Sequence, residues 1–213
     1  MSNSVSIQGA SGVEATRRRL SERQAETVDR VLDAALHMLR TDGYGALTVR
    51  GVASAAGVAP ATAYNYFTSR EHLVTEVFWR LLSASQPARL DGRLGAARRV
   101  TATLRDVTDL VVAEPELAAA CTAAMLADDA DVKVLRDRIG ADLRRRLLMA
   151  LGGETREGDG TADPAVIGVL ELAISGALLQ AGMGHLDYSE LPGRLATVVD
   201  LVVGRGRHLG GTQ

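Results

Sequence analysis

The side chains best suited to binding chemistry gather in one short stretch, GVAPATAYNYFTSR, which starts at residue 57 of the 213-residue chain. Tyr64 and Tyr66 carry hydroxyl groups that can hydrogen-bond to phosphate oxygens. Arg70 at the end of the stretch and Arg50 before it supply the positive charge that binding to a phosphate backbone requires. The stretch therefore predicts a nucleic-acid-binding surface, in a chain whose aromatic content is only 3%.

Two short helices are predicted to hold these side chains. Thr48 can cap the first, which ends at Gly57, a residue that allows a tight turn. Pro60 suits the start of the second, because proline lacks only an N–H that would be unbonded there. This layout is that of a helix-turn-helix, whose second helix enters the DNA major groove. Thr62 on that helix offers a methyl group to thymine and a hydroxyl to a base or phosphate.

A longer helix precedes the pair and another follows it. The first is predicted to begin at Ser21, with Gln24 at capping-box spacing, and to end at Gly43. Ser69 caps the following helix, which starts with Glu71 in its first turn. The alternative is a small bundle whose tyrosines fill the core, although two tyrosines and an asparagine on one seven-residue helix cannot all face inward.

These features together resemble the DNA-binding region of the tetracycline-repressor (TetR) family of transcription regulators, over about residues 24–80. The matching residues are Gly43-Tyr44, Leu47-Thr48-Val49, Val52-Ala53, Ala56-Gly57-Val58, Tyr64 with Phe67, and Ser69-Arg70-Glu71-x-Leu73. The resemblance implies a sequence-specific DNA-binding regulator of the repressor type, without catalytic activity. The DNA contacts that it implies are Thr48, Arg50, Pro60, Ala61, Thr62, Tyr64, Asn65, Tyr66 and Arg70.

Two positions depart from the family pattern. Ala59 stands where a capping serine is common, and Ala63 stands where leucine is usual. Pro60 and Ala61 occupy the base-facing start of the second helix and offer few hydrogen bonds to bases. We therefore expect weak direct readout of sequence, supplemented by thymine-methyl contacts and by DNA shape.

The whole chain is predicted to be all-α and to contain three regions. Residues 1–20 form a flexible arm, in which Arg17–Arg19 could reach a minor groove or could be a solvated basic tail. Residues 21–84 form a helix-turn-helix three-helix bundle that binds DNA. Residues 85–213 form a larger helical domain for dimerisation and ligand sensing, with helices near 94–113, 115–127, 130–151, 164–184 and 190–205.

The sequence AVIGVLELAISGALLQAGM at 165–183 is apolar on nearly all sides. Such a helix is buried on more than one side, and a second subunit is a natural cover. With the last helix it is predicted to form a four-helix bundle across a two-fold axis; the alternative is a core helix of a monomer. A homodimer favours a palindromic operator with half-sites about 34–36 Å apart. The predicted interface residues are Val169, Leu172, Leu179, Leu191, Leu195, Val198, Val199 and Val202.

A sensing pocket is predicted among the helices of the larger domain. No aromatic residue lies between Trp79 and Tyr188, which favours an apolar or lipid-like ligand over a flat cation held by stacking. For any single candidate, the alternative of plain core or interface packing is favoured. A bound ligand would favour a dimer geometry that no longer matches the DNA. The candidate lining residues are Thr101, Leu104, Thr108, Cys121, Met125, Ile139, Leu143, Leu170 and Ile174.

Other function classes find little support. The net charge of -2 argues against a uniformly basic nucleic-acid binder. One cysteine, Cys121, excludes an intramolecular disulfide, and the four histidines lack metal-ligand spacing. We expect a cytoplasmic protein with no cofactor, no metal, no membrane partner and no catalytic function. The remaining alternative is a ligand-independent helical scaffold that uses the N-terminal bundle for protein contacts.

Overall fold

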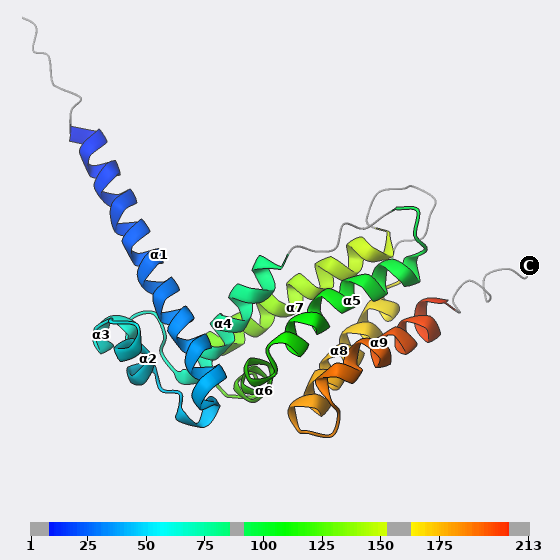
Figure 1. Ribbon diagram of the computed structural model, residues 1–213. Coiled ribbons are helices and arrows are strands. Elements are labelled where there is room, and N and C mark those ends of the chain that lie inside the picture. The colour runs from blue at the N-terminus through cyan, green and yellow to red at the C-terminus, as the bar shows by residue number, and fades with distance from the viewer. Residues whose placement is uncertain (1–8, 86–91, 153–162, 205–213) are drawn as a thin grey trace, which may run out of the picture.

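The computed structural model describes residues 9–85, 92–152 and 163–204, with side chains from residue 22 onward (Figure 1). These residues form helices and no strand, so the predicted all-α fold is confirmed. The helices are α1 (Gly9–Asp42), α2 (Val49–Ala55), α3 (Pro60–Tyr64), α4 (Arg70–Ala84), α5 (Ala96–Ala113), α6 (Pro115–Ala124), α7 (Ala130–Leu151), α8 (Pro164–Gly182) and α9 (Leu191–Val199). Three short turns complete them: η1 (Tyr44–Ala46), η2 (Tyr188–Glu190) and the π-helical η3 (Asp200–Gly204).

Local sequence determines where the short helices begin and end. Thr48 caps α2, and its Oγ1 accepts a hydrogen bond of 3.0 Å from the Gly51 amide. Gly57 then turns the chain with a φ of 64°, a left-handed conformation that glycine adopts without strain. Pro60 is the first residue of α3, which ends at Tyr64 and is therefore shorter than predicted. These caps and the turn set the angle at which α3 leaves the bundle.

The first helix starts earlier than predicted. α1 begins at Gly9 and runs through Ser21, so the interpretation of Ser21 as a helix cap is wrong. The sequence before Ser21 contains no proline and several good helix formers, which lets the helix continue towards the N-terminus. Residues 9–20 of the predicted arm are therefore helical in their backbone. Residues 1–8 and the side chains of Arg17–Arg19 lie outside the described part of the chain.

The apolar core runs continuously through the molecule, and α4 is the helix that both regions share. α4 packs against α1 on one side and against α6 and α7 on the other. Phe67 and Phe78 contribute the aromatic volume of the N-terminal half of this core. Beyond them the buried side chains are mainly leucine, valine and alanine. The predicted boundary near residue 84 thus coincides with the end of the shared helix.

The last helix packs against its own subunit. α9 lies on α5 and α8, and Leu191, Leu195 and Val199 are buried there with at most 2% of their surface exposed. The structure thus places these three predicted interface residues in the core of their own subunit. The spacing of four residues that marks an apolar helix face does not say which partner covers that face. Val198 and Val202 are partly buried.

Helix α8 leaves much of its apolar surface uncovered. Leu172 is 75% exposed, Met183 52%, Val169 45% and Leu179 37%. In length and composition α8 is the one helix of the described chain that could cross a membrane. A helix that packs inside a soluble assembly meets the same criteria, so this observation is weak evidence for a membrane span.

Candidate DNA interface and sensing cavity

Helix α3 presents small and polar side chains to solvent. Pro60 and Ala61 in its first turn are exposed, and Tyr64 at its end is 49% exposed. Ala63 lies on the opposite side and is completely buried. A helix anchored on one side and exposed at its first turn has the geometry needed to enter a DNA groove.

The structure places the nine predicted DNA contacts at different depths. Exposed residues are Thr48, Arg50, Pro60, Ala61, Tyr64 and Asn65, whereas Thr62, Tyr66 and Arg70 are partly buried. Tyr66 packs partly against the core, with its ring centroid 6.5 Å from that of Phe67. Tyr64 therefore offers more free surface to a phosphate than Tyr66 does.

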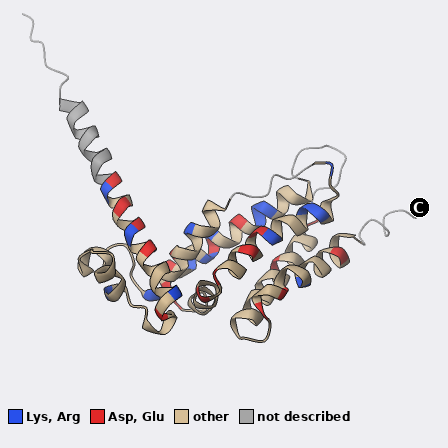
Figure 2. Ribbon diagram, in the orientation of Figure 1, with Lys and Arg blue, Asp and Glu red and all other residues tan. Residues whose placement is uncertain are grey.

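The surface formed by α2 and α3 carries very little charge. Between Gly43 and Ser69 the only charged residue is Arg50. Figure 2 shows the two helices almost entirely tan, in contrast to the red and blue of α1 and α7. Arg50 is exposed on α2 and forms no ion pair with any carboxylate of the described residues. Its guanidinium is therefore free to bind a phosphate.

Arg70, the second arginine predicted to bind the DNA backbone, already has partners within the protein. Its Nε and Nη2 donate hydrogen bonds of 3.2 and 3.1 Å to Glu71 Oε1, and its guanidinium lies 4.2 Å from the centre of the Tyr44 ring. Burial acts to raise the pKa of Glu71, but hydrogen bonds from its own backbone amide, Arg70 and Tyr44 outweigh burial and lower the pKa. Glu71 is therefore ionised at neutral pH and offsets part of the Arg70 charge.

Thr48 keeps one hydrogen-bonding group for a partner. Its oxygen is used as an acceptor in the cap of α2, but the hydroxyl hydrogen has no acceptor among the described residues. The hydroxyl lies in the exposed turn before Arg50. A hydroxyl in this position can donate to a phosphate oxygen while its own oxygen still stabilises the helix start.

Hydrogen bonds connect the start of α4 to the start of α7. They join four residues, Thr68, Ser69, Asp129 and Asp131, which we call the α4–α7 junction. Ser69 Oγ donates to Asp129 Oδ2 at 2.6 Å, and Thr68 Oγ1 donates to Asp131 Oδ2 at 2.6 Å. Ser69 and Asp129 are also the caps of α4 and α7. The hydrogen bond from Ser69, followed by those from the Val132 and Asp131 amides, lowers the pKa of Asp129 despite its partial burial.

A further polar contact joins the two regions on another side. Arg40, near the end of α1, binds Glu114 through an ion pair, in which Arg40 Nε lies 2.9 Å from Glu114 Oε2. Glu114 is the residue between α5 and α6. The DNA-facing helices are therefore attached to the larger domain at two separate points.

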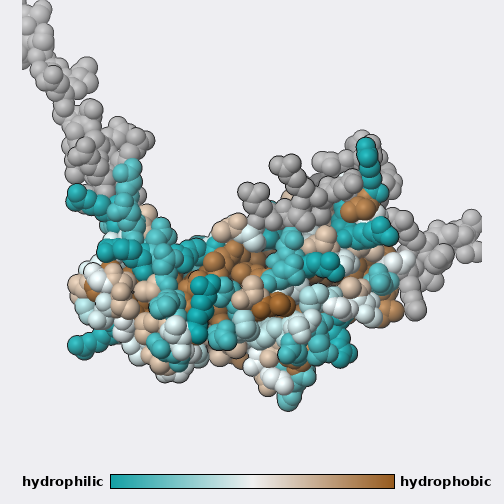
Figure 3. Space-filling view, in the orientation of Figure 1, coloured by the Kyte–Doolittle hydropathy of each residue, from teal (hydrophilic) through white to brown (hydrophobic). Residues whose placement is uncertain are grey.

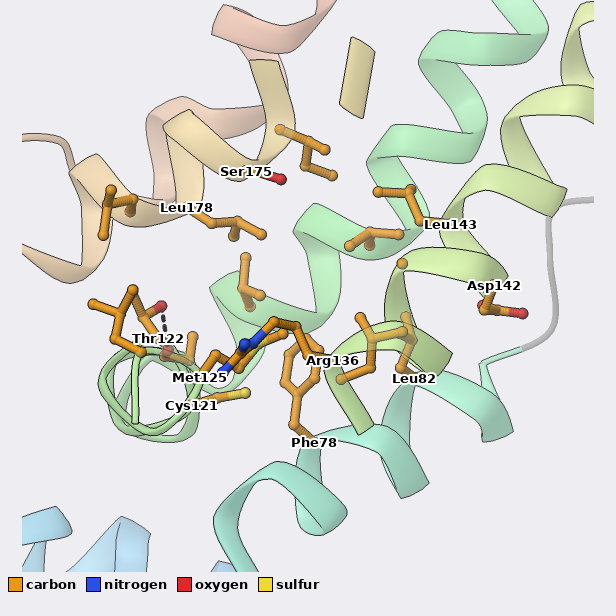
Figure 4. A pocket seen from close by; sticks show the side chains of 18 of the residues that line it. Phe78, Leu82, Cys121, Thr122, Met125, Arg136, Asp142, Leu143, Ser175 and Leu178 are labelled. Atoms are coloured by element: carbon orange, nitrogen blue, oxygen red, sulfur yellow. Dashed lines mark hydrogen bonds between the residues drawn. The ribbon is translucent and has the colours of Figure 1, made fainter. Parts of the chain in front are cut away.

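A cavity of about 390 Å³ lies among α4, α5, α6, α7 and α8 (Figure 4). This volume is within the range of small-molecule sites, which is about 300–1,000 Å³. Five of the predicted lining residues do line it: Cys121, Met125, Ile139, Leu143 and Ile174. The lining is mainly aliphatic but also includes one aromatic side chain, that of Phe78.

Other predicted lining residues lie elsewhere. Leu104, Thr108 and Leu170 are buried in the core away from the cavity, and Thr101 is partly buried outside it. Thr108 turns its hydroxyl back to the carbonyl oxygen of Arg105, as a helical threonine often does. Helical spacing identifies residues that face inward, but it does not distinguish a cavity wall from packed core.

The contribution of α4 to the cavity was not predicted from the sequence. Phe78 and Leu82 line it, although they belong to the region assigned to DNA binding. Arg136, Asp142 and Arg146 also line it and were not predicted. The available signal was the apolar residues of α4, which recur on more than one face and therefore indicate a helix covered on two sides.

Cys121 behaves as a packing residue in this cavity. Burial raises the pKa of its thiol to about 12, so the group stays protonated at neutral pH. A protonated thiol is a poor nucleophile. Among the described residues no group of three or more His, Cys, Asp and Glu side chains could hold a metal ion.

The capped helix α2, the glycine turn and the exposed helix α3 define a helix-turn-helix DNA-binding protein. The family described as "Bacterial regulatory proteins, tetR family" matches residues 31–77, which span the end of α1 through most of α4. An uncharacterised HTH-type transcriptional regulator of Mycobacterium tuberculosis is 45% identical over 185 residues, covering 86% of this chain and 83% of that protein. The chain belongs to the TetR family of bacterial transcriptional regulators.

Other relatives agree in length and fold. The HTH-type transcriptional repressor KstR of Rhodococcus jostii is 29% identical over 192 residues, and the match covers 87% of each chain. A TetR transcriptional regulator from Rhodococcus sp. RHA1 has a crystal structure that superposes with a TM-score of 0.70 at 20% identity, covering 84% of this chain and 97% of that one. The relatives are regulators rather than enzymes, in agreement with the prediction from sequence.

Proposed function

We propose that this regulator binds a palindromic operator as a homodimer, represses transcription there, and is released when a small, mainly apolar ligand occupies the cavity. The observation that carries the proposal is the position of α4. Its N-terminus follows α3 after a five-residue turn, and its middle contributes Phe78 and Leu82 to the cavity wall. One rigid helix therefore contacts both the DNA-facing surface and the ligand.

The exposed face of α8 supports dimerisation. Val169, Leu172, Leu179 and Met183 follow one another at intervals of three, seven and four residues, which keeps them on one side of the helix. In Figure 3 apolar side chains also reach the surface over the middle of the molecule, between the N-terminal helices and the last two helices. Large apolar patches on soluble proteins mark interaction sites, and a two-fold interface uses the same face of both subunits.

Support for repression comes from a related protein. The KstR protein of Rhodococcus jostii, which matches most of this chain, is named a transcriptional repressor. A repressor of this kind acts on DNA in the cytoplasm and needs no catalytic group. A ligand that binds one dimer geometry more tightly than the other shifts the population towards that geometry. The change in free energy between the two geometries cannot exceed the difference in the ligand's binding free energy for them.

The two attachments between the regions give the ligand a route to the DNA surface. The α4–α7 junction holds the start of α4 against α7, whose second and third turns line the cavity at Arg136, Ile139 and Gly140. A ligand that displaces α4 relative to α7 moves the turn that follows α3. Because operator half-sites have a fixed spacing, a small change in the distance between two α3 helices is enough to weaken binding.

Binding of the full-length protein to DNA from upstream of its own gene tests the proposal. The expected result is a saturable complex of one dimer per site whose affinity falls steeply between 50 and 200 mM salt, as for other phosphate-contacting proteins, by roughly tenfold or more. Light scattering of the same sample gives the oligomeric state. A monomer that binds upstream DNA no better than random DNA would contradict the proposal and favour a protein-binding scaffold.

A further inference from the structure

The cavity contains few polar side chains, and most of them have hydrogen-bond partners within the protein. The polar residues of the lining are Thr122, Arg136, Asp142, Arg146 and Ser175. Thr122 donates to the carbonyl oxygen of Ala118 at 2.9 Å, and Ser175 is a neutral hydroxyl on the exposed side of α8. The charged groups of the lining all come from α7.

Two of the charged side chains satisfy each other. Arg146 Nε donates to Asp142 Oδ2 at 2.6 Å, and Arg146 Nη2 donates to the Leu82 carbonyl oxygen at 2.8 Å. Arg146 Nη1 reaches Ser85 Oγ at 3.2 Å. Asp142 is also paired with Arg145. This cluster holds α7 against the end of α4 and has no free charge to offer a ligand.

Arg136 differs from its neighbours. Its Nη2 donates to the carbonyl oxygen of Ala127 at 3.2 Å, but its Nε is shielded from solvent and meets no acceptor in the described part of the chain. Its guanidinium also forms no ion pair with any carboxylate of the described residues. An arginine remains protonated in proteins, and a shielded N–H of a charged group without an acceptor is costly. The Arg136 guanidinium therefore has no anionic partner among the described residues.

We propose that Arg136 binds the anionic headgroup of the ligand, a carboxylate or a phosphate, and that the rest of the ligand is aliphatic. The fork of N–H groups on a guanidinium matches both anions in geometry. Figure 4 shows the Arg136 side chain reaching from α7 towards Cys121 of α6 and Met125, which follows α6, with Leu143 and Leu178 on the far side of the cavity. The inference rests on the proposed function and deepens it by naming the class of ligand.

Three probes with one alkyl chain test this assignment: dodecanoate, dodecyl phosphate and dodecanol, each below its micelle concentration. Calorimetry on the full-length protein should give an affinity for at least one anion that is about tenfold to a hundredfold higher than that for dodecanol, because of the charged hydrogen bond. The anion that binds more tightly identifies the headgroup. This comparison needs no variant and so does not depend on how substitutions fold.

Substitutions then assign the preference to one residue. Arg136→Gln should lower the affinity for the preferred anion to about that for dodecanol, with less than a roughly twofold change for dodecanol itself. Arg138→Gln is the matched control, because Arg138 is two residues away on α7, exposed, and near the Trp79 ring rather than in the cavity lining. It should change neither affinity.

Two results would overturn the proposal. One is a wild-type protein in which neither anion binds more tightly than dodecanol; the other is an Arg136→Gln variant that loses all three probes equally, which would make the arginine a packing residue. Titration of the operator complex separates this proposal from the proposed function. Anion binding that leaves the DNA complex intact contradicts regulation by ligand but keeps the Arg136 site, whereas release by dodecanol alone contradicts the Arg136 site but keeps regulation.

Discussion

The surface expected to bind DNA and the helix that lines the cavity differ most in their charge. From Gly43 to Ser69 there is one charged residue, Arg50, although DNA is a polyanion. Helix α7 carries nine: Asp131, Lys133, Arg136, Asp137, Arg138, Asp142, Arg144, Arg145 and Arg146. The apolar cavity therefore lies beside a highly charged helix.

This difference teaches that the number of charges is a poor guide to their use. On α7, Lys133 is paired with Asp137, and Arg144 is paired with Glu171 of α8. Charges paired in this way contribute little to binding anything else. Arg50 on the DNA side and Arg136 in the cavity, by contrast, form no ion pair with a carboxylate of the described residues. Each of the following predictions tests how independent the two regions are.

The largest effect is expected from Leu172→Glu on the exposed face of α8. Two like charges near a two-fold axis oppose association by several kcal/mol, so the dimer should dissociate and operator binding should be lost although α2 and α3 are unchanged. Light scattering measures the mass. Val134→Glu on α7 is the control, since Val134 is also apolar and 57% exposed. Loss of the dimer in both variants, or in neither, would contradict an interface on α8.

Arg50→Ala should have the next largest effect on DNA binding. Each lost phosphate contact reduces the steepness of the plot of log K against log salt by about 0.9. Loss of one contact in each subunit of a dimer therefore reduces it by about 1.8. Affinity should fall by roughly 3 kcal/mol or more in total, since each charged hydrogen bond contributes about 1.5–3 kcal/mol. Fluorescence anisotropy over a range of salt measures both quantities. Arg98→Ala, on the exposed side of α5, should leave the slope unchanged.

Disruption of the α4–α7 junction, which connects the two regions, should have a smaller effect, on the free energy of unfolding. A double-mutant cycle of Ser69→Ala and Asp129→Ala should show a coupling free energy of about 1–2 kcal/mol in unfolding, beyond the loss of each helix cap. The pKa of Asp129 is lowered in the folded protein, chiefly by the hydrogen bond from Ser69. The contact therefore stabilises the fold above the unfolded pKa of about 3.9, and this stability is lost as the pH falls below that value. Additive single variants, or a coupling that persists well below pH 3, would contradict a direct contact.

A smaller effect on DNA binding than that of Arg50→Ala is expected from Tyr64→Phe. Removal of one hydroxyl should weaken operator binding by about 0.5–1.5 kcal/mol for each subunit. The melting temperature should stay the same, because Tyr64 is exposed and its hydroxyl bonds nothing among the described residues. A lower melting temperature with unchanged DNA affinity would assign Tyr64 to packing instead.

The caps and turns of the DNA-facing helices could be predicted from sequence because the signals are local. Thr48, Ser69 and Pro60 each act within one turn of chain, and the structure has them where expected. The prediction that Ser21 begins a helix was wrong because a capping pattern does not end a helix when the residues on both sides of it can be helical. A local pattern is reliable where a competing signal is absent.

The sensing half could be predicted only in outline, because its features depend on the partner of each helix. The helix positions were close, but the place of Phe78 in the cavity wall was not predicted, and Leu195, predicted at a dimer interface, is buried in its own subunit. Periodicity identifies an apolar face and cannot name what covers it. The free N–H of Arg136 likewise depends on where Asp142 and Arg146 lie.

The small residues at the start of α3 have a consequence for how such regulators diversify. Ala59, Pro60 and Ala61 are exposed and contribute nothing to the buried core, so their replacement should leave the fold intact. A single change there to a residue with a longer polar side chain could add a contact to a base without disturbing the cavity. Operator preference and ligand preference can thus be inherited and altered separately, which allows a duplicated gene to acquire a new target while it still responds to the old signal.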